Sequence, residues 1–327
     1  MLFLVTGVAG FIGSYVASGL LDEGHDVIGI DNLNDYYDVG LKQTRLLALT
    51  KRKRFQFEQR DLEDPESLIS LSVRNDVDRV VHLAAQAGVR YSLEKPFAYL
   101  ASNITGHLSV LEFCRHAAKR PFLAYASSSS VYGNSTPLPF SEDAEVRRPV
   151  SLYAATKIAD ELMSETYASL YGLRNFGMRF FTVYGPWGRP DMAYWSFTEK
   201  ILKSEPIRVF NGGQMRRDFT FIDDAVSAVL SIALAQNDLL KTKPMHRIYN
   251  IGHNQPVTLL DFIAGIEGCA GVESKKIMEP MQPGDVAETC ADISRISLEF
   301  DYQPQIGLRE GLTRFVDWFR HYSGWLA

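Results

Sequence analysis

Short apolar runs alternate with longer amphipathic stretches through the first half of the chain. The runs are apolar at successive positions, which is typical of strands buried on both faces of a parallel sheet. The stretches between them place apolar residues at helical spacing. We expect strands at residues 2–5, 27–30, 55–58, 79–83, 122–126 and 175–181. We expect helices at residues 15–21, 41–49, 103–118 and 152–171.

This alternation predicts an α/β fold with a doubly wound parallel sheet of the Rossmann type. After residue 181 the alternation weakens, because Pro186, Gly188 and Pro190 indicate a long loop. Shorter elements follow, and an amphipathic helix is expected at residues 308–322. We therefore expect residues 1–180 to form a nucleotide-binding domain that carries the catalytic residues. Residues 181–327 should form mainly a smaller mixed α/β substrate-binding lobe, with the chain free to cross between the two.

The first apolar run breaks into a glycine-rich turn, Thr6-Gly7-Val8-Ala9-Gly10-Phe11-Ile12-Gly13. Its glycines let the backbone turn tightly, approach a pyrophosphate and pack the next helix close to the strand. The N-terminus of that helix favours the negative charge of phosphates. Asp31 closes the second strand, where an acid can hold both ribose hydroxyls of an adenosine and would repel the 2'-phosphate of NADP. Strand, turn, helix, strand and acid in this order predict an NAD site.

Composition narrows the class of protein. With 46% hydrophobic residues the 327-residue chain can bury a large core, and no apolar run approaches the roughly 18 residues of a membrane span. The net charge of -5 argues against a nucleic-acid surface, and the apolar first strand lacks the flanks of an export signal. Cys114, Cys269 and Cys290 lack the paired spacing of disulfides or metal ligands. We expect a cytoplasmic protein that binds no metal, membrane or nucleic acid.

A run of serines, Ser127 to Ser130, follows the fifth predicted strand, and Tyr153 and Lys157 begin the long helix after it. A tyrosine and a lysine at this spacing share one face of a helix. The ammonium and the positive nicotinamide ring favour the phenolate, which can take a hydroxyl proton. Ser128 can hydrogen-bond the same substrate oxygen while hydride leaves its carbon. Alone, such a pair is more often a helix-surface contact, but after a dinucleotide turn it predicts a dehydrogenase triad of Ser128, Tyr153 and Lys157.

These motifs and their spacings resemble the extended short-chain dehydrogenase/reductase family over nearly the whole chain. More narrowly, residues 31–38 and the segment Arg179-Phe-Phe-Thr-Val-Tyr-Gly-Pro-Trp-Gly-Arg-Pro-Asp-Met-Ala193 are similar to UDP-glucuronate 4-epimerases. The resemblance implies an NAD-dependent isomerase that interconverts UDP-glucuronate and UDP-galacturonate through a 4-keto sugar. It also implies that Tyr153 is the base, that Lys157 binds the nicotinamide ribose and that NAD stays bound throughout the cycle.

The candidate cofactor positions gather at the ends of the predicted strands. Asp61 and the amide of Leu62 can meet the adenine edge after the third strand, and small residues after the fourth permit close approach of a ligand. The expected cofactor-binding residues are Gly7, Gly10, Phe11, Ile12, Gly13, Asp31, Asn32, Asp61, Leu62, Leu83, Ala84, Ala85, Asn103, Tyr153, Lys157 and Phe180.

The resemblance places the UDP-sugar on the later lobe. Arg217 stands at the position that meets the diphosphate, and Asp285 at the one that accepts from the uridine ribose. More distant galactose epimerases carry an arginine where this chain has Gln282, so this position lacks the guanidinium that makes one of their diphosphate contacts. A sugar carboxylate needs a cationic or hydrogen-bonding partner, and Thr182 and Arg189 lie in the loop that the resemblance places near C6. The expected substrate-binding residues are Arg90, at either the carboxylate or the phosphates, Ser128, Ser129, Thr182, Arg189, Arg217 and Asp285.

Other functions fit parts of this pattern. A UDP-N-acetylhexosamine or UDP-hexose 4-epimerase would differ in the sugar that it accepts. A UDP-glucuronate decarboxylase would carry a glutamate immediately before the Val-Tyr-Gly that follows the serine run, where this chain has Ser130. A non-catalytic NAD-sensing protein would not need the base, the lysine and the serine together. The resemblance also implies a homodimer, in which helices 103–118 and 152–171 of both subunits pair.

Overall fold

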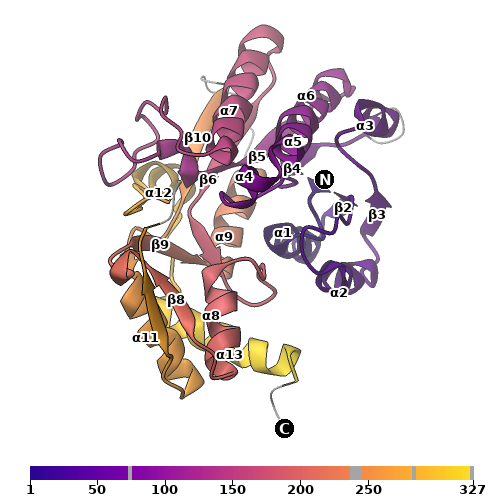
Figure 1. Cartoon of the computed structure of the whole chain (residues 1–327). Helices are drawn as coiled ribbons and strands as arrows, with labels where there is room; N and C mark the ends of the chain where they lie inside the picture. Colours follow the sequence, from indigo (N-terminus) through magenta and orange to yellow (C-terminus); the bar gives the residue numbers. More distant parts are fainter. Residues whose placement is uncertain (73–75, 236–244, 282–284, 325–327) are drawn as a thin grey trace.

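A parallel sheet forms the centre of the molecule (Figure 1). The computed structural model describes residues 1–72, 76–235, 245–281 and 285–324. Within them the sheet has seven strands in the order β10-β6-β5-β4-β1-β2-β3, and the direction of winding reverses between β1 and β4. The strands are β1 (Leu2–Thr6), β2 (Asp26–Asp31), β3 (Phe55–Gln59), β4 (Arg79–His82), β5 (Phe122–Ser128), β6 (Asn175–Phe180) and β10 (His246–Ile251). The predicted doubly wound Rossmann-type fold is confirmed, and its reversal point is where such sheets bind ligands.

Alternate strand residues pack on opposite faces of this sheet, which gives the strands their continuous apolar sequences. Phe3 and Val5 join one hydrophobic core, and Leu4 and Ile28 join the other. The first core includes residues of α1 (Phe11–Asp22), α2 (Val39–Thr50) and α9 (Ile222–Ala233). The second includes residues of α3 (Pro65–Ser72), α6 (Gly106–His116) and α7 (Leu152–Tyr171). Both faces are thereby covered.

The long helix α7 carries Tyr153 and Lys157 in its first two turns, and local sequence sets its ends. Ser151 caps the start, because its hydroxyl accepts from the amide of Ala154 at 3.1 Å. Gly172 ends the helix in the left-handed region, with φ 68°. The helix therefore spans the predicted residues 152–171, and the positions of the two catalytic candidates are fixed by its cap.

The helix expected at residues 103–118 begins differently in the structure. Two short helices, α4 (Tyr91–Glu94) and α5 (Pro96–Tyr99), lead into a wider π-helical turn, η1 (Leu100–Thr105), and α6 follows. The wide turn brings Asn103 inward, where its side chain bonds both the backbone amide and the carbonyl of Gln86. Helical periodicity alone could not indicate this turn, because the bonds that hold it come from another segment.

The smaller lobe lies below the central sheet in the view of Figure 1. Its three-stranded sheet has the order β11-β9-β7, and a parallel pair joins β12 and β8. These strands are β7 (Thr182–Tyr184), β8 (Ile207–Phe210), β9 (Arg216–Phe221), β11 (Pro256–Thr258) and β12 (Lys276–Glu279). Its helices are α8 (Ala193–Leu202), α11 (Leu259–Ala270) and α13 (Leu308–Tyr322), and η3 (Asn211–Gly213) is a short 3-10 turn of the same lobe. The helix α12 (Ser294–Phe300) packs against β10 and α9, and the 3-10 turn η2 (Ser129–Tyr132) directly follows β5 of the central sheet. Between β9 and β11 the chain crosses back to the large domain. There β10 is the edge strand of the central sheet, and α9 packs in a layer that covers one of its faces.

Three further observations concern the chain as a whole. Among the described residues, no helix combines the length and apolar content that a membrane crossing requires. Cys114, Cys269 and Cys290 are free thiols. In the same residues no group of three or more His, Cys, Asp or Glu side chains is placed to hold a metal ion.

Candidate active site

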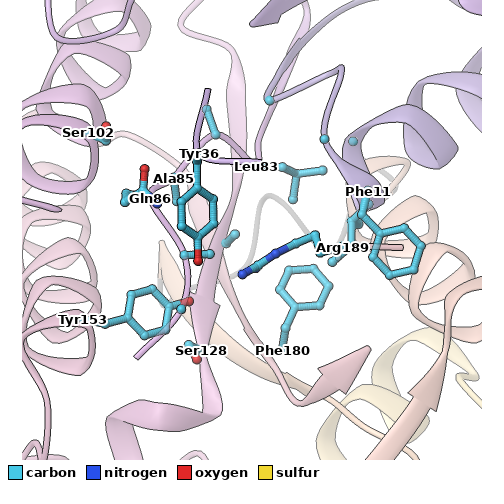
Figure 2. Close-up of a pocket in the computed structure, with 18 of the residues that line it drawn as sticks. Phe11, Tyr36, Leu83, Ala85, Gln86, Ser102, Ser128, Tyr153, Phe180 and Arg189 are labelled. Atoms are coloured by element: carbon cyan, nitrogen blue, oxygen red, sulfur yellow. The ribbon is translucent and has the colours of Figure 1, made fainter. Parts of the chain in front are cut away.

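A cavity of about 420 Å³ opens at the carboxyl ends of the central strands. Its wall combines the ends of β1, β2, β5 and β6 with the loops that follow β3 and β4 and with β7 of the smaller lobe. Figure 2 shows Tyr153, Ser128, Phe180, Arg189 and Tyr36 around this space. The predicted residues that line it are Gly7, Gly10, Phe11, Ile12, Gly13, Asp31, Asn32, Asp61, Leu62, Leu83, Ala84, Ala85, Ser128, Ser129, Tyr153, Lys157, Phe180, Thr182 and Arg189.

The glycine turn has the shape that a dinucleotide phosphate needs. Gly7 adopts φ +71°, and a Cβ atom on Gly13 would lie 2.1 Å from the Gly7 carbonyl oxygen, so the turn has no room for side chains there. Gly10 is the N-cap of α1 and offers no side-chain acceptor to the amides of the first turn, whose residues line the cavity. Free amides and the positive end of a helix dipole are what a pyrophosphate requires.

Asp31 lies at the end of β2 with both carboxylate oxygens anchored. One oxygen accepts from the amide of Ala9 at 3.1 Å and the other from the amide of Leu33 at 2.9 Å. Burial raises the pKa of Asp31, while these amides and the nearby Lys42 ammonium act in the opposite direction. Each oxygen keeps a second lone pair, so the fixed carboxylate can still accept from a pair of ribose hydroxyls. The residues of the turn and Asp31 therefore fit an adenosine diphosphate.

All three catalytic candidates line the cavity, and Figure 2 shows Tyr153 and Ser128 near each other in its wall. The Lys157 ammonium donates to the Ala126 carbonyl oxygen and to Asp160 Oδ2, both at 3.0 Å. The ring of Tyr153 packs edge-on against Tyr99, with centroids 6.0 Å apart. Ser128 Oγ accepts from the amide of Ser130 at 3.2 Å, which fixes the serine at the end of β5. Base, cation and hydroxyl are thus delivered by two rigid elements, α7 and β5.

Buried charged side chains stabilise the elements that carry these residues. The Arg179 guanidinium on β6 donates to both oxygens of Glu161 on α7, at 2.8 and 2.7 Å. Ser127, next to Ser128, donates to the same carboxylate at 2.6 Å. Burial raises the pKa of Asp160 to about 6, opposed by Lys157. Burial and the Lys157 charge lower the pKa of His82 to about 3, so this imidazole is neutral.

Arg189 is anchored at the edge of the cavity by an acid of its own loop. Its Nε donates to Asp191 Oδ1 at 3.0 Å and its Nη2 to Asp191 Oδ2 at 2.5 Å. The hydroxyl of Tyr36 donates to the same Oδ2 at 3.1 Å. Burial opposes ionisation of Arg189, but Asp191 outweighs it and raises the pKa of the guanidinium. In Figure 2 the Arg189 side chain reaches into the cavity between Tyr36 and Phe180.

Three other predicted substrate residues form a separate group next to this cavity. Arg90 Nη2 lies 3.6 Å from Asp285 Oδ2, and its guanidinium stacks over the ring of Phe210 at 5.1 Å. Burial lowers the pKa of Arg217, opposed by the charge of Asp285. Arg90 directly follows Val89 of the cavity wall, and Arg217 lies on β9, which pairs with β7 beside Thr182. The group therefore continues the cavity towards the smaller lobe.

The assignment of Asn103 to the cofactor stays a prediction, as does the role of position 282. Asn103 is buried and donates to Thr156 Oγ1 at 2.9 Å, so it supports α7 and the Gln86 loop and is absent from the described wall of the cavity. Gln282 lies outside the described residues.

Sequence reasoning missed several wall residues. Tyr36 belongs to the polar and aromatic loop after Asp31, but nothing in that loop distinguishes it from its neighbours. Lys42 and Gln86 line the cavity without belonging to any motif. Asp191 is not a wall residue but pairs with Arg189 of the wall, and here a signal exists, since an acid two positions after an arginine can hold its guanidinium.

Four features define the class of protein: the order of the sheet, the glycine turn, the acid at the end of β2 and the Ser-Tyr-Lys group. Together they are those of a nucleotide-dependent enzyme of the short-chain dehydrogenase/reductase class. The sequence profile of the NAD dependent epimerase/dehydratase family matches residues 3–252, and the chain belongs to this family. UDP-glucuronate 4-epimerase 2 of Arabidopsis thaliana is 44% identical over 98% of this chain and 76% of that protein. The probable UDP-glucuronate 4-epimerase of Rhizobium meliloti is 40% identical over 98% of this chain and 97% of that protein. The solved UDP-glucuronic acid 4-epimerase of Bacillus cereus, in complex with UDP-glucuronic acid and NAD, superposes with a TM-score of 0.90 at 34% identity, covering 98% of this chain and 100% of that one.

Proposed function

We propose that the protein interconverts UDP-glucuronate and UDP-galacturonate by inverting the sugar at C4, with NAD as bound cofactor. The observation that carries the proposal is that Ser128, Tyr153 and Lys157 line the same cavity as Arg189 and Thr182. The first three suit oxidation of a hydroxyl carbon, and the last two suit a carboxylate. The relatives named above support the same substrate, since the Arabidopsis protein is named a UDP-glucuronate 4-epimerase, the Rhizobium protein a probable one, and the solved Bacillus cereus epimerase holds UDP-glucuronic acid.

The residues divide the chemistry between them. Tyr153 takes the proton of the 4-hydroxyl and later returns it, and Ser128 hydrogen-bonds the same oxygen. When bound, NAD supplies the group that accepts the C4 hydrogen as hydride and gives it back. Lys157 keeps a positive charge beside the phenolate and holds the nicotinamide ribose, with Asp160 and the Ala126 carbonyl fixing its ammonium. The other expected cofactor residues in the wall hold the adenosine and the pyrophosphate.

Inversion requires the sugar to present both faces to the same chemical groups. A ketone at C4 is planar, so hydrogen returned to its second face inverts the centre. We assign Arg217 and Asp285 to the UDP end, where they anchor the nucleotide while the sugar turns, with Arg90 at the phosphates. Residues 1–180 then serve mainly the cofactor and the chemistry, and residues 181–327 mainly the UDP-sugar.

The ketone also lies β to the carboxylate, so loss of carbon dioxide competes with inversion. Thr182 and Arg189 hold the carboxylate out of the alignment that cleavage needs. Ser130 occupies the wall position where decarboxylases of this class carry a glutamate, so an acid that would assist a lyase is replaced by a hydroxyl. This favours an epimerase over a decarboxylase.

The test uses purified protein incubated with UDP-glucuronate and no added NAD, followed by separation of the sugar nucleotides. We expect UDP-galacturonate, with little UDP-pentose. Tyr153→Phe should abolish turnover and retain NAD, because it removes the proton acceptor and keeps the ring. A UDP-pentose as main product, or conversion of UDP-N-acetylhexosamine in preference to the uronate, would contradict the assignment.

We further propose that the protein works as a cytoplasmic homodimer that engages neither membranes nor nucleic acids. The free thiols support a reducing compartment. Exposed apolar side chains on the α4 to α7 side support the dimer: Phe97 is 81% exposed, and Leu93, Leu108, Leu162 and Leu170 are also exposed. Light scattering should give twice the mass of the chain at micromolar concentration, and Leu162→Glu should reduce it. A monomer under these conditions would refute the dimer.

A further inference from the structure

The ion pair between Arg189 and Asp191 is unusual for a side chain that receives a substrate carboxylate, because the acid already occupies one edge of the guanidinium. A guanidinium has five N–H donors, and Asp191 takes the pair formed by Nε and Nη2. The end formed by Nη1 and the second hydrogen of Nη2 stays available. A substrate carboxylate therefore meets an arginine whose charge is already balanced.

Tyr36 is a second partner of Asp191, and Gly88 leaves room for this contact. The Tyr36 hydroxyl donates to Asp191 Oδ2 at 3.1 Å. Gly88 has φ +101°, and a Cβ atom there would lie 2.8 Å from the Tyr36 hydroxyl and 3.7 Å from Asp191 Oδ2. The hydroxyl of Tyr99 donates to the Ala87 carbonyl at 3.0 Å and so helps to fix this loop. Three segments far apart in the sequence thus meet at one carboxylate.

We propose that Asp191 is a positioning residue that weakens the grip of Arg189 on the substrate carboxylate, so that the carboxylate can leave when the sugar turns over. This inference rests on the proposed function, in which the carboxylate must change its place between the two faces of the sugar. An unpaired arginine would bind the carboxylate more tightly and hold the sugar in one orientation. Uniformly tighter binding of this kind lowers KM without helping the reaction.

The inference predicts opposite changes in binding and turnover. Asp191→Asn keeps the shape of the side chain and removes its charge, so the repulsion between two carboxylates beside Arg189 disappears. In a Tyr153→Phe background, which blocks turnover, the Kd of UDP-glucuronate should fall by roughly tenfold. In the otherwise unchanged enzyme, Asp191→Asn should lower both KM and kcat. The Kd of neutral UDP-glucose should stay the same.

Tyr36→Phe supplies a second variant with the opposite sign. Without the hydroxyl, Asp191 loses a competing hydrogen bond and pairs more strongly with Arg189, so the Kd of UDP-glucuronate should rise about twofold to threefold. Loss of order alone would weaken binding in both variants. Asp143→Asn is the control, because Asp143 pairs with Arg295 on the surface, away from the cavity wall, and it should change neither constant.

Binding is measured by titration calorimetry, and bound NAD and the melting temperature report whether each variant folds. A Kd that rises or stays constant in Asp191→Asn overturns the inference even if the wild type is an epimerase. An unchanged or lower Kd in Tyr36→Phe also overturns it. A wild type that neither binds nor converts UDP-glucuronate overturns the proposed function, and the inference with it.

Discussion

The buried pair of Arg179 and Glu161 should be among the most costly side-chain contacts to break. The two side chains are 4% and 8% exposed, and they tie β6 to α7, the helix that carries the candidate catalytic residues Tyr153 and Lys157. Glu161→Gln keeps an acceptor for Ser127 but leaves the guanidinium buried without a counter-charge. Removing one partner of a buried ion pair costs about 3–5 kcal/mol, since the remaining charge keeps its desolvation penalty.

The expected fall in melting temperature follows from chain length. With an unfolding entropy of about 2 cal/mol/K per residue, 327 residues lose stability at roughly 0.7 kcal/mol per degree near Tm. Glu161→Gln should therefore lower Tm by about 4–7 °C in scanning calorimetry. The double variant Glu161→Leu with Arg179→Met should lose less than the single one, because no unpaired charge remains.

A surface pair provides the matched control. Arg147 and Glu145 are 78% and 71% exposed and lie 3.0 Å apart. Such pairs contribute about 0–1 kcal/mol, so Glu145→Gln should move Tm by no more than about 1.5 °C. If Glu161→Gln shifts Tm no more than this control, or if the double variant is the less stable of the two, the reasoning about the buried charge is wrong.

Two further predictions concern pH and the cofactor turn. The pKa of Asp160 rises to about 6 on folding, from about 3.9 in an unfolded chain, so the native state binds more protons between these values and stability falls as pH rises from about 4 to 6. The whole change in the free energy of unfolding is on the order of 3 kcal/mol. Urea unfolding of Asp160→Asn between about pH 4 and 6 should lack this dependence on pH. If the variant keeps the same dependence, another group titrates in this range. Gly13→Ala places a Cβ atom 2.1 Å from the Gly7 carbonyl oxygen, so the turn must open and NAD binding by calorimetry should weaken at least about tenfold. Gly268→Ala, where a Cβ atom has nothing within 4 Å, should bind NAD as the wild type does.

The parts of the fold that sequence predicted are those that local pattern determines. Buried parallel strands need apolar residues on both faces, so β1 to β6 appear as runs in the sequence, and α7 appears through its serine cap and its terminal glycine. β10 could not be placed in this way. The chain reaches it only after passing through part of the smaller lobe, and its place in the sheet depends on pairing with β6, about seventy residues earlier.

The same distinction applies to the site. The glycine turn, Asp31 and the residues of the Ser-Tyr-Lys group could be proposed because each belongs to a short motif whose spacing carries chemistry. The partners of Arg189 could not, because Tyr36 lies 155 positions from Asp191 and the contact exists only once two loops meet. Asn103 was assigned to the cofactor, and its inward position depends on the wide turn before α6.

Arg45 on α2 connects the two halves of the site. Its Nη1 donates to the carbonyl of Ala9 in the glycine turn at 3.1 Å, and its Nη2 donates to the carbonyls of Trp187 and Gly188 at 2.6 and 2.7 Å. The second pair of carbonyls immediately precedes Arg189. One buried guanidinium therefore fixes both the turn that would hold the pyrophosphate and the loop that would hold the sugar carboxylate. Displacing either segment disturbs the bonds of Arg45 to the other, so we expect cofactor binding at the turn and carboxylate binding at the loop to be coupled through these contacts.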